Sequence, residues 1–144
     1  YFAYGPGGIN VVDVEDVARG HLLALDRGVV GQRYLLSGTD ISYRDLFGRV
    51  QEIAGLSRKA FGVPTAAMMA LGFAGDLVGT FREPLIDSVT VRYSSQFLYY
   101  DNALARRELG YEYTPLNDVL KKAIDWFEAE GYFSADAKWR LKIF

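Results

Sequence analysis

The chain has 144 residues, a length that fits one domain able to bury roughly 70% of its unfolded surface. Its 16 basic and 18 acidic residues form no block of either sign, which argues against nucleic acid or an anionic membrane as a partner. The absence of cysteine excludes disulfides and thiolate metal sites, and a single histidine excludes a histidine-rich metal centre.

Residues 1–8 are rich in glycine, proline and aromatic side chains, a composition that predicts a loop. Residues 11–14 are predicted to form a short strand, and a helix follows from Glu15. Its apolar positions recur at helical spacing until Gly28 and Gly31, which end the pattern. The expected core-facing stripe consists of Val14, Val17, Ala18, Leu22 and Leu25.

Acidic side chains crowd the start of this helix at Asp13, Glu15 and Asp16. Such a cluster is compatible with acid–base or metal chemistry, but we interpret the acids as groups that cap the helix and complement its dipole. His21 falls on the side of the apolar stripe, which favours a core or interface position over a catalytic base.

Residues 33–37 are predicted to form a strand, followed by a turn at 38–40. Ser42 and Asp45 have the spacing of a capping box, which predicts a helix that ends at Gly55. Pro64 suits the first turn of a third helix, whose residues 66–71 are apolar all round. The uncharged stretch around this helix is too short in its apolar part to span a bilayer, so we expect no membrane span.

The C-terminal half is predicted to contain a helix over 84–92, a strand over 97–100 and a short helix capped by Asp101 or Asn102 that ends at Gly110. Thr114 is expected to cap a last helix, with Pro115 in its first turn and Gly131 beyond its end. Residues 134–144 are expected to be a tail.

The order of these segments resembles the C-terminal portion of the extended short-chain dehydrogenase/reductase family, in its NAD-dependent epimerase/dehydratase and dihydroflavonol-reductase-like branch. Residues 12–18 (Val-Asp-Val-Glu-Asp-Val-Ala) resemble the junction between a short strand and a helix in that family. Three later segments resemble its late strand, its closing strand, turn and helix, and its terminal helix: 31–38, 98–111 and 114–127. We therefore expect further sequence before Tyr1.

The resemblance implies a mostly helical α/β fold, the C-terminal portion of a Rossmann-type reductase, in which residues 1–133 form the substrate-binding portion. A small parallel two-stranded sheet would pair residues 11–14 with 97–100. Residues 33–37 would belong to the main sheet of the family, which this chain lacks.

Two motifs of the family are absent from the sequence. The family binds NAD or NADP through a glycine-rich turn after its first strand, and its catalytic pair is a tyrosine with a lysine four residues later. None of the ten tyrosines has that lysine, and the spacing of Gly72, Gly75 and Gly79 falls within a helix, where it favours close packing. We therefore expect no catalytic, cofactor-binding or metal-binding residue here, and NAD or NADP only in the intact enzyme.

The resemblance places the segment with Tyr4, Gly7, Gly8 and Asn10 beside the substrate, where glycines let backbone amides approach a polar ligand. A plain surface loop is equally compatible with these residues. The resemblance also puts Arg92 near the place where some members bind a nucleotide-sugar diphosphate, with a surface arginine as the alternative.

These observations predict the substrate-binding part of a cytoplasmic NAD(P)-dependent epimerase, dehydratase or reductase that acts on a nucleotide sugar or a related hydroxy or keto compound. We expect the isolated chain to be inactive. A stand-alone module that binds such a ligand without turnover is one alternative. The other is an oligomerisation domain that associates through the helix at 66–71. A homodimer is compatible with each of these functions.

Overall fold

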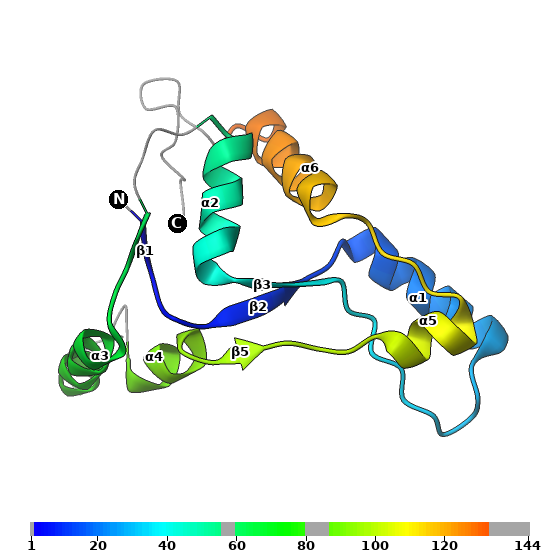
Figure 1. Cartoon of the computed structure of the whole chain (residues 1–144), viewed down its shortest axis with the longest axis horizontal. Helices are drawn as coiled ribbons and strands as arrows, with labels where there is room; N and C mark the ends of the chain where they lie inside the picture. The colour runs from blue at the N-terminus through cyan, green and yellow to red at the C-terminus, as the bar shows by residue number, and fades with distance from the viewer. Residues whose placement is uncertain (1, 56–59, 80–86, 133–144) are drawn as a thin grey trace.

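The structure is a computed structural model that describes residues 2–55, 60–79 and 87–132 (Figure 1). Helices dominate it, and the strands are short. The helices are α1 (Val14–Arg27), α2 (Tyr43–Ile53), α3 (Thr65–Gly79), α4 (Ser88–Ser94), α5 (Ala103–Leu109) and α6 (Leu116–Ala129). The strands are β1 (Phe2–Tyr4), β2 (Gly8–Val11), β3 (Thr39–Ser42), β4 (Ala60–Gly62) and β5 (Phe97–Leu98).

The described strands form two small sheets. In one, β1 pairs in parallel with β4. In the other, β2 lies between β3 and β5, parallel to β5 and antiparallel to β3. The expected mostly helical α/β fold is confirmed, as is a small parallel pairing with the segment at 97–98, but Gly8 and Ile9 form that pairing in place of residues 11–14. The expected two-stranded sheet has gained a third, antiparallel strand.

Several strand boundaries differ from the prediction. Residues 2–4 form β1 where a loop was expected, because they find a partner in β4. Strand β2 ends at Val11, three residues early, because Asp13 already caps α1. Residues 33–37 form no strand, and the strand β3 begins within the expected turn at 38–40. The Asn10 side chain of β2 holds the start of this turn, because its Oδ1 accepts the Gly38 N–H at 2.8 Å. Whether residues 33–37 belong to a larger sheet stays a prediction.

The helix boundaries agree more closely with the sequence signals. Helix α1 ends before Gly28, and the Ser42 hydroxyl caps α2 by accepting the Asp45 N–H at 3.1 Å. Helix α5 ends before Gly110, which adopts a left-handed backbone conformation with φ 70°. Helix α4 begins at Ser88, and the part of its predicted span at 84–86 lies outside the described residues, as does the tail at 134–144.

The buried core lies between α1, α5 and the segment that follows α5. Ala105, Leu109 and Tyr111 form its centre, and partly buried Leu23 and Leu36 pack against them. The predicted core-facing stripe of α1 is wrong in this chain, because Val14, Leu22 and Leu25 are 77%, 67% and 86% exposed. Helix α1 instead turns its buried Asp16 and Gly20 side inward.

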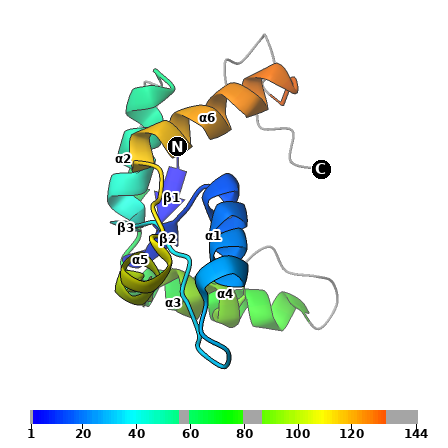
Figure 2. The same ribbon diagram turned by 90° about the vertical axis from the view of Figure 1, so that its right-hand side faces the viewer.

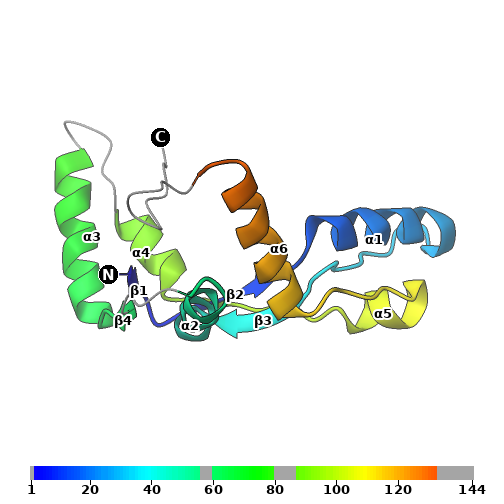
Figure 3. The same cartoon turned by 90° about the horizontal axis from the view of Figure 1, so that it is seen from above.

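The molecule is elongated, with α3 and α4 at one end and α1 and α5 at the other, joined by the three-stranded sheet (Figures 1 and 3). Helix α6 lies against α2 on one side of the sheet (Figure 2). In the described ranges, every helix is too short or too polar to cross a lipid bilayer.

Candidate functional site

Helix α4 and the turn after it carry three polar side chains at four-residue spacing: Ser88, Arg92 and Gln96. Residues four apart lie on one face of a helix, so these side chains form a row, here called the α4 row. Asp87 caps the helix, since its Oδ1 accepts the Thr90 N–H at 2.7 Å. Hydrogen bonds from the Thr90 side chain and amide lower the pKa of Asp87, which keeps this capping group charged.

A cavity of about 280 Å³ lies between α3 and α4, on one side of the α4 row. Gly72 is buried and lets the two helices approach, because a Cβ atom at this position would lie 3.0 Å from Ser88 Cα. This contact confirms the predicted packing role of Gly72. The residues that line the cavity are Thr65, Met69, Phe73, Ser88, Val91, Arg92, Ser95 and Gln96.

A second hollow of about 340 Å³ lies on the other side of the α4 row. It shares Ser88, Arg92 and Gln96 with the first cavity and adds Val89 and Tyr93. The Tyr93 side chain is 61% exposed, so its ring is accessible to a ligand. Arg92 therefore borders two cavities, one with a mainly apolar α3 wall and one with a tyrosine.

Arg92 is exposed, and within the described residues its guanidinium makes no hydrogen bond or ion pair. No acidic side chain of the described residues lines either cavity beside it. A guanidinium with unused donors forms strong, often bidentate hydrogen bonds with carboxylate and phosphate groups. The chemistry that this site supports is therefore the binding of an anionic group next to an apolar one.

Gly7 and Gly8 lie directly against the turn that ends the α4 row. The Gly7 N–H donates to Ser94 O at 3.2 Å, and the Gly8 N–H donates to Gln96 O at 3.0 Å. A Cβ atom at Gly7 would lie 2.3 Å from Gln96 O, so only glycine allows this approach. Both backbone amides are thus used within the chain, and these glycines hold the position of Gln96.

Tyr4 and Asn10 also have partners within the chain. The Tyr4 ring stacks on Phe47 with centroids 6.1 Å apart. The Asn10 side chain joins β2 to β3, because its Nδ2 donates to Asp40 at 2.6 Å while its Oδ1 accepts from Gly38. Of the five residues expected to contact substrate, Gly7 and Gly8 contact the end of α4 and the turn after it, and Arg92 lies on α4 four residues before Gln96. A direct contact of any of the five with substrate stays a prediction.

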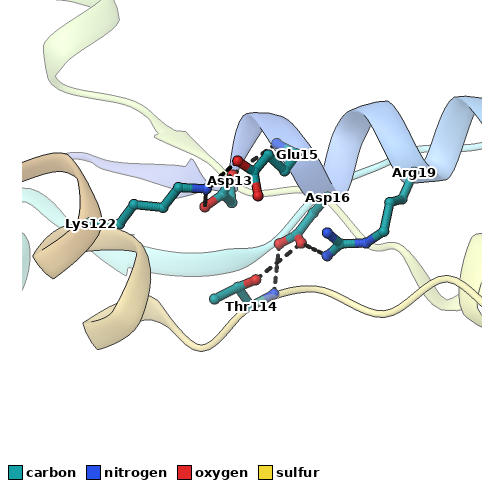
Figure 4. Close-up of polar contacts among 6 residues, drawn as sticks. All are labelled: Asp13, Glu15, Asp16, Arg19, Thr114 and Lys122. Atoms are coloured by element: carbon teal, nitrogen blue, oxygen red, sulfur yellow. Dashed lines mark hydrogen bonds and ion pairs between the residues drawn. The ribbon is translucent and has the colours of Figure 1, made fainter. Parts of the chain in front are cut away.

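The acidic junction before α1 ties this helix to α6 (Figure 4). Asp13 caps α1 by accepting the Glu15 N–H at 2.8 Å, and the Lys122 Nζ lies 3.0 Å from Asp13 Oδ2 and 2.9 Å from Glu15 Oε1. The Glu15 amide and then Lys122 lower the pKa of Asp13, while Glu15 and then Asp13 raise the pKa of Lys122. The interpretation of Asp13 as a helix cap agrees with this geometry.

Asp16 has a different role from the other two acids. Its side chain is fully buried and reaches the segment before α6, where it accepts the Thr114 N–H at 2.6 Å and the Thr114 hydroxyl at 3.0 Å (Figure 4). Arg19 pairs with the same carboxylate. Thr114 was expected to cap α6, but its hydroxyl donates to Asp16, and Pro115 occupies the cap position. Asp16 therefore anchors α1 to the segment before α6.

His21 is exposed, and its Nδ1 donates to the Val17 carbonyl at 2.8 Å. Its expected core position is therefore wrong for this chain, and the alternative interface position stays a prediction. No group of three or more His, Cys, Asp or Glu side chains among the described residues is arranged to hold a metal ion. The spaced glycines Gly72, Gly75 and Gly79 lie within α3, where Gly72 packs on Ser88, and not in a turn after a strand.

Most residues around Arg92 carry no functional signal in the sequence. Gln96 follows Arg92 by four residues, a spacing that predicts a shared helix face, but α4 was expected to end at residue 92. Met69 and Phe73 also lie four residues apart on α3. Because that helix is apolar on all sides, periodicity does not distinguish a cavity wall from a core face.

Comparison with known proteins finds similarity to reductases and epimerases, although no family model matches the chain. A dihydroflavonol 4-reductase-like protein of Synechocystis sp. is 34% identical over 136 residues, which cover 90% of this chain and 40% of that protein. A nucleoside-diphosphate-sugar epimerase structure from Pseudomonas aeruginosa is 38% identical, with a TM-score of 0.71 over 92% of this chain and 39% of the other.

The fold is also shared at lower identity. The structure of UDP-glucuronic acid 4-epimerase from Bacillus cereus in complex with NAD has a TM-score of 0.57 and is 17% identical, over 90% of this chain and 33% of that one. The chain thus spans about 40% of the length of the proteins that it matches at 34% and 38% identity.

Proposed function

We propose that the chain is the substrate-binding portion of an extended short-chain dehydrogenase/reductase, an NAD(P)-dependent epimerase, dehydratase or reductase. Its matches to a reductase-like protein and to an epimerase support the reaction class. The substrate would be a nucleotide sugar or a related hydroxy or keto compound. The cofactor, NAD or NADP, would be held by the remainder of the enzyme, because this sequence has no glycine-rich turn after a strand.

Arg92 carries this proposal. Its guanidinium is exposed, borders both cavities beside α4 and has no partner within the described residues. An anionic group of the substrate would bind to Arg92. The parts of the substrate on either side of that group would lie in the two cavities that Arg92 borders. Gly7 and Gly8 would contribute by fixing the Gln96 turn, whereas Tyr4 and Asn10 would stabilise the strands that support it.

The binding role is tested by thermal unfolding of the chain with UDP-glucose at increasing concentration. A ligand that binds only the native state raises the midpoint temperature. At a free ligand concentration of 100 times its Kd, the free energy of unfolding rises by about 2.7 kcal/mol. Arg92→Gln should abolish most of the shift, and Arg106→Gln, an exposed arginine on α5, should leave it intact. A shift that is equal in both variants would remove Arg92 from the site.

The division of labour between this chain and the rest of the enzyme has a separate test. The chain alone should show no NAD(P)-dependent turnover, because it has no Tyr-x-x-x-Lys pair and no glycine-rich nucleotide turn. Absorbance at 340 nm with NADH or NADPH and a panel of keto compounds measures this directly. Reproducible turnover by the purified chain would overturn the proposal. The cytoplasmic location expected from the sequence stays a prediction.

An oligomerisation module is the second candidate, favoured by exposed apolar side chains on α3. Leu71, Phe73 and Leu77 are 56%, 65% and 72% exposed, and exposed apolar patches mark interaction surfaces. Sedimentation velocity over a range of concentrations distinguishes this candidate. A chain that stays monomeric at every concentration in the series would count against it.

A further inference from the structure

The cavity between α3 and α4 has two chemically different walls. Helix α3 contributes Met69 and Phe73, which are 49% and 65% exposed, and the buried Val91 of α4 forms part of the lining. Most of the polar groups belong to α4 and the turn after it, with Arg92 at the border to the second hollow, and Thr65 is the polar residue that α3 adds to the lining. A ligand that lies here would place an apolar part against α3 and an anionic part at α4.

We propose that this cavity binds the apolar part of an anionic amphiphile whose charged group pairs with Arg92, so that the substrate is an amphiphilic hydroxy or keto compound and not a nucleotide sugar. The inference rests on the proposed substrate-binding function and narrows its substrate class. The occupant of the exposed α3 wall is then a small molecule, because the positive charge of Arg92 complements its anionic group.

The α3 wall favours a hydrocarbon over a nucleotide base. A base carries several hydrogen-bond donors and acceptors on its edges, and each loses its water when it is buried. On the α3 wall, Phe73 offers no such partner, Met69 offers only a weak acceptor, and Thr65 offers one hydroxyl, whereas an alkyl or ring hydrocarbon needs none. The volume of about 280 Å³ is at the lower limit of ligand cavities, which span roughly 300–1,000 Å³. The cavity therefore holds one part of a ligand while the remainder lies over the α4 row.

The two methionines of the chain provide a probe and its internal control. Met69 lines the cavity. Met68 lies next to it in sequence but on another side of α3, where its Sδ is 3.2 Å from the position that a Cβ atom of Gly5 would occupy. With ¹³C-methyl-methionine, NMR spectra of the full chain contain two methyl signals, and a ligand in the cavity should shift Met69 far more than Met68.

The titration uses butyl, hexyl and octyl phosphate below their micelle concentrations, with inorganic phosphate and UMP as comparisons. If the alkyl chain enters the cavity, each added CH₂ group should tighten binding by up to about four-fold, the equivalent of burying one methylene. Inorganic phosphate should bind much more weakly than octyl phosphate. UMP, which carries the same charged group on a polar base, should bind more weakly than octyl phosphate as well.

Two pairs of variants separate this site from adsorption to any exposed apolar surface. Arg92→Gln should weaken every alkyl phosphate by about five- to ten-fold through loss of a charge-assisted hydrogen bond, and Arg106→Gln should not. Phe73→Ala should flatten the dependence on chain length. Leu71→Ala removes a similarly exposed side chain of α3 that does not line the cavity, so it should preserve that dependence.

The outcomes distinguish this inference from the proposed function. If UMP or UDP-glucose shifts Met69 and binds more tightly than octyl phosphate, the amphiphile class is wrong while the substrate-binding role stands. If affinity is independent of chain length, or unaffected by Phe73→Ala, the cavity is not the apolar subsite. If none of these compounds shifts Met69, both the inference and the proposed use of this site fail.

Discussion

Asp16 and Tyr111 are both buried near the junction of α1 and α5, but their polar atoms differ in hydrogen bonding. The Asp16 carboxylate is satisfied by Thr114 and Arg19. The Tyr111 hydroxyl has no hydrogen-bond partner within the part of the chain that the structure describes. Burial, and then the nearby Asp16 charge, raise the pKa of Tyr111. A buried polar group without a partner lowers stability by about 1–3 kcal/mol, so the Tyr111 hydroxyl destabilises the folded chain.

Tyr111→Phe should therefore leave the free energy of unfolding unchanged or raise it by up to about 1 kcal/mol, because it removes an unpartnered hydroxyl and keeps the ring. Tyr34→Phe is the matched control. The Tyr34 hydroxyl donates to Glu108 at 2.9 Å and accepts the Val29 N–H at 3.2 Å, so its loss should cost about 1 kcal/mol. Urea denaturation of both variants measures the difference, and a larger loss for Tyr111→Phe would show that its hydroxyl has a partner.

The charge of Asp13 should make part of the stability depend on pH. The Glu15 amide and Lys122 hold the pKa of Asp13 below its unfolded value of about 3.9. This contribution is therefore complete above the unfolded pKa and is lost as the pH falls through the folded pKa. Asp13→Asn keeps a good helix cap but removes the charge.

The expected result is that Asp13→Asn is less stable than the wild type at pH 7 and that the difference narrows as the pH falls below about 4. Urea denaturation from pH 7 to pH 2.5 measures it. Asp26→Asn, which changes an exposed acid paired with Arg27, should show a small difference at every pH. A difference for Asp13→Asn that stays constant over this range would contradict the assigned role of the charge.

At the scale of elements, the sequence predicts helices well because their signals are local. Ser42 caps α2 and Gly110 ends α5, and each effect involves only neighbouring residues. Strand positions and helix faces depend on distant partners, so β1 was missed and the buried face of α1 was misplaced. Arg92 was found only through a resemblance, whereas Met69 and Phe73 join it through the packing of α3 on α4, which no local pattern encodes.

The exposed face of α1 leads to a paired prediction. Leu25 is 86% exposed and Leu109 is fully buried in the core cluster, and both are leucines near a helix C-terminus. Leu109→Ala should cost about 2–5 kcal/mol through lost contacts and a cavity. Leu25→Ala should change the free energy of unfolding by no more than about 0.5 kcal/mol. Urea denaturation of the chain tests both, and a large cost at Leu25 would mean that α1 is covered in solution.

At the scale of the whole molecule, stability is distributed unevenly along the long axis. The cluster of Ala105, Leu109 and Tyr111 lies at the α1–α5 end (Figure 1). At the other end, Gly72 and Val91 are the buried residues that the described parts of α3 and α4 contribute. The thin three-stranded sheet is the connection between the two ends. Regions with few buried apolar contacts open at lower free energy than the core.

Amide hydrogen exchange should reveal this difference. The central amides of α1 should exchange only through global unfolding, because that helix packs on the core cluster. The amides of α3 should exchange through local opening, with protection that is lower and less sensitive to denaturant. Since α3 forms one wall of the candidate site, an alkyl phosphate bound there should slow exchange in α3 and leave α1 unchanged. Equal protection of α1 and α3 without ligand would show instead that the two ends unfold as one cooperative unit.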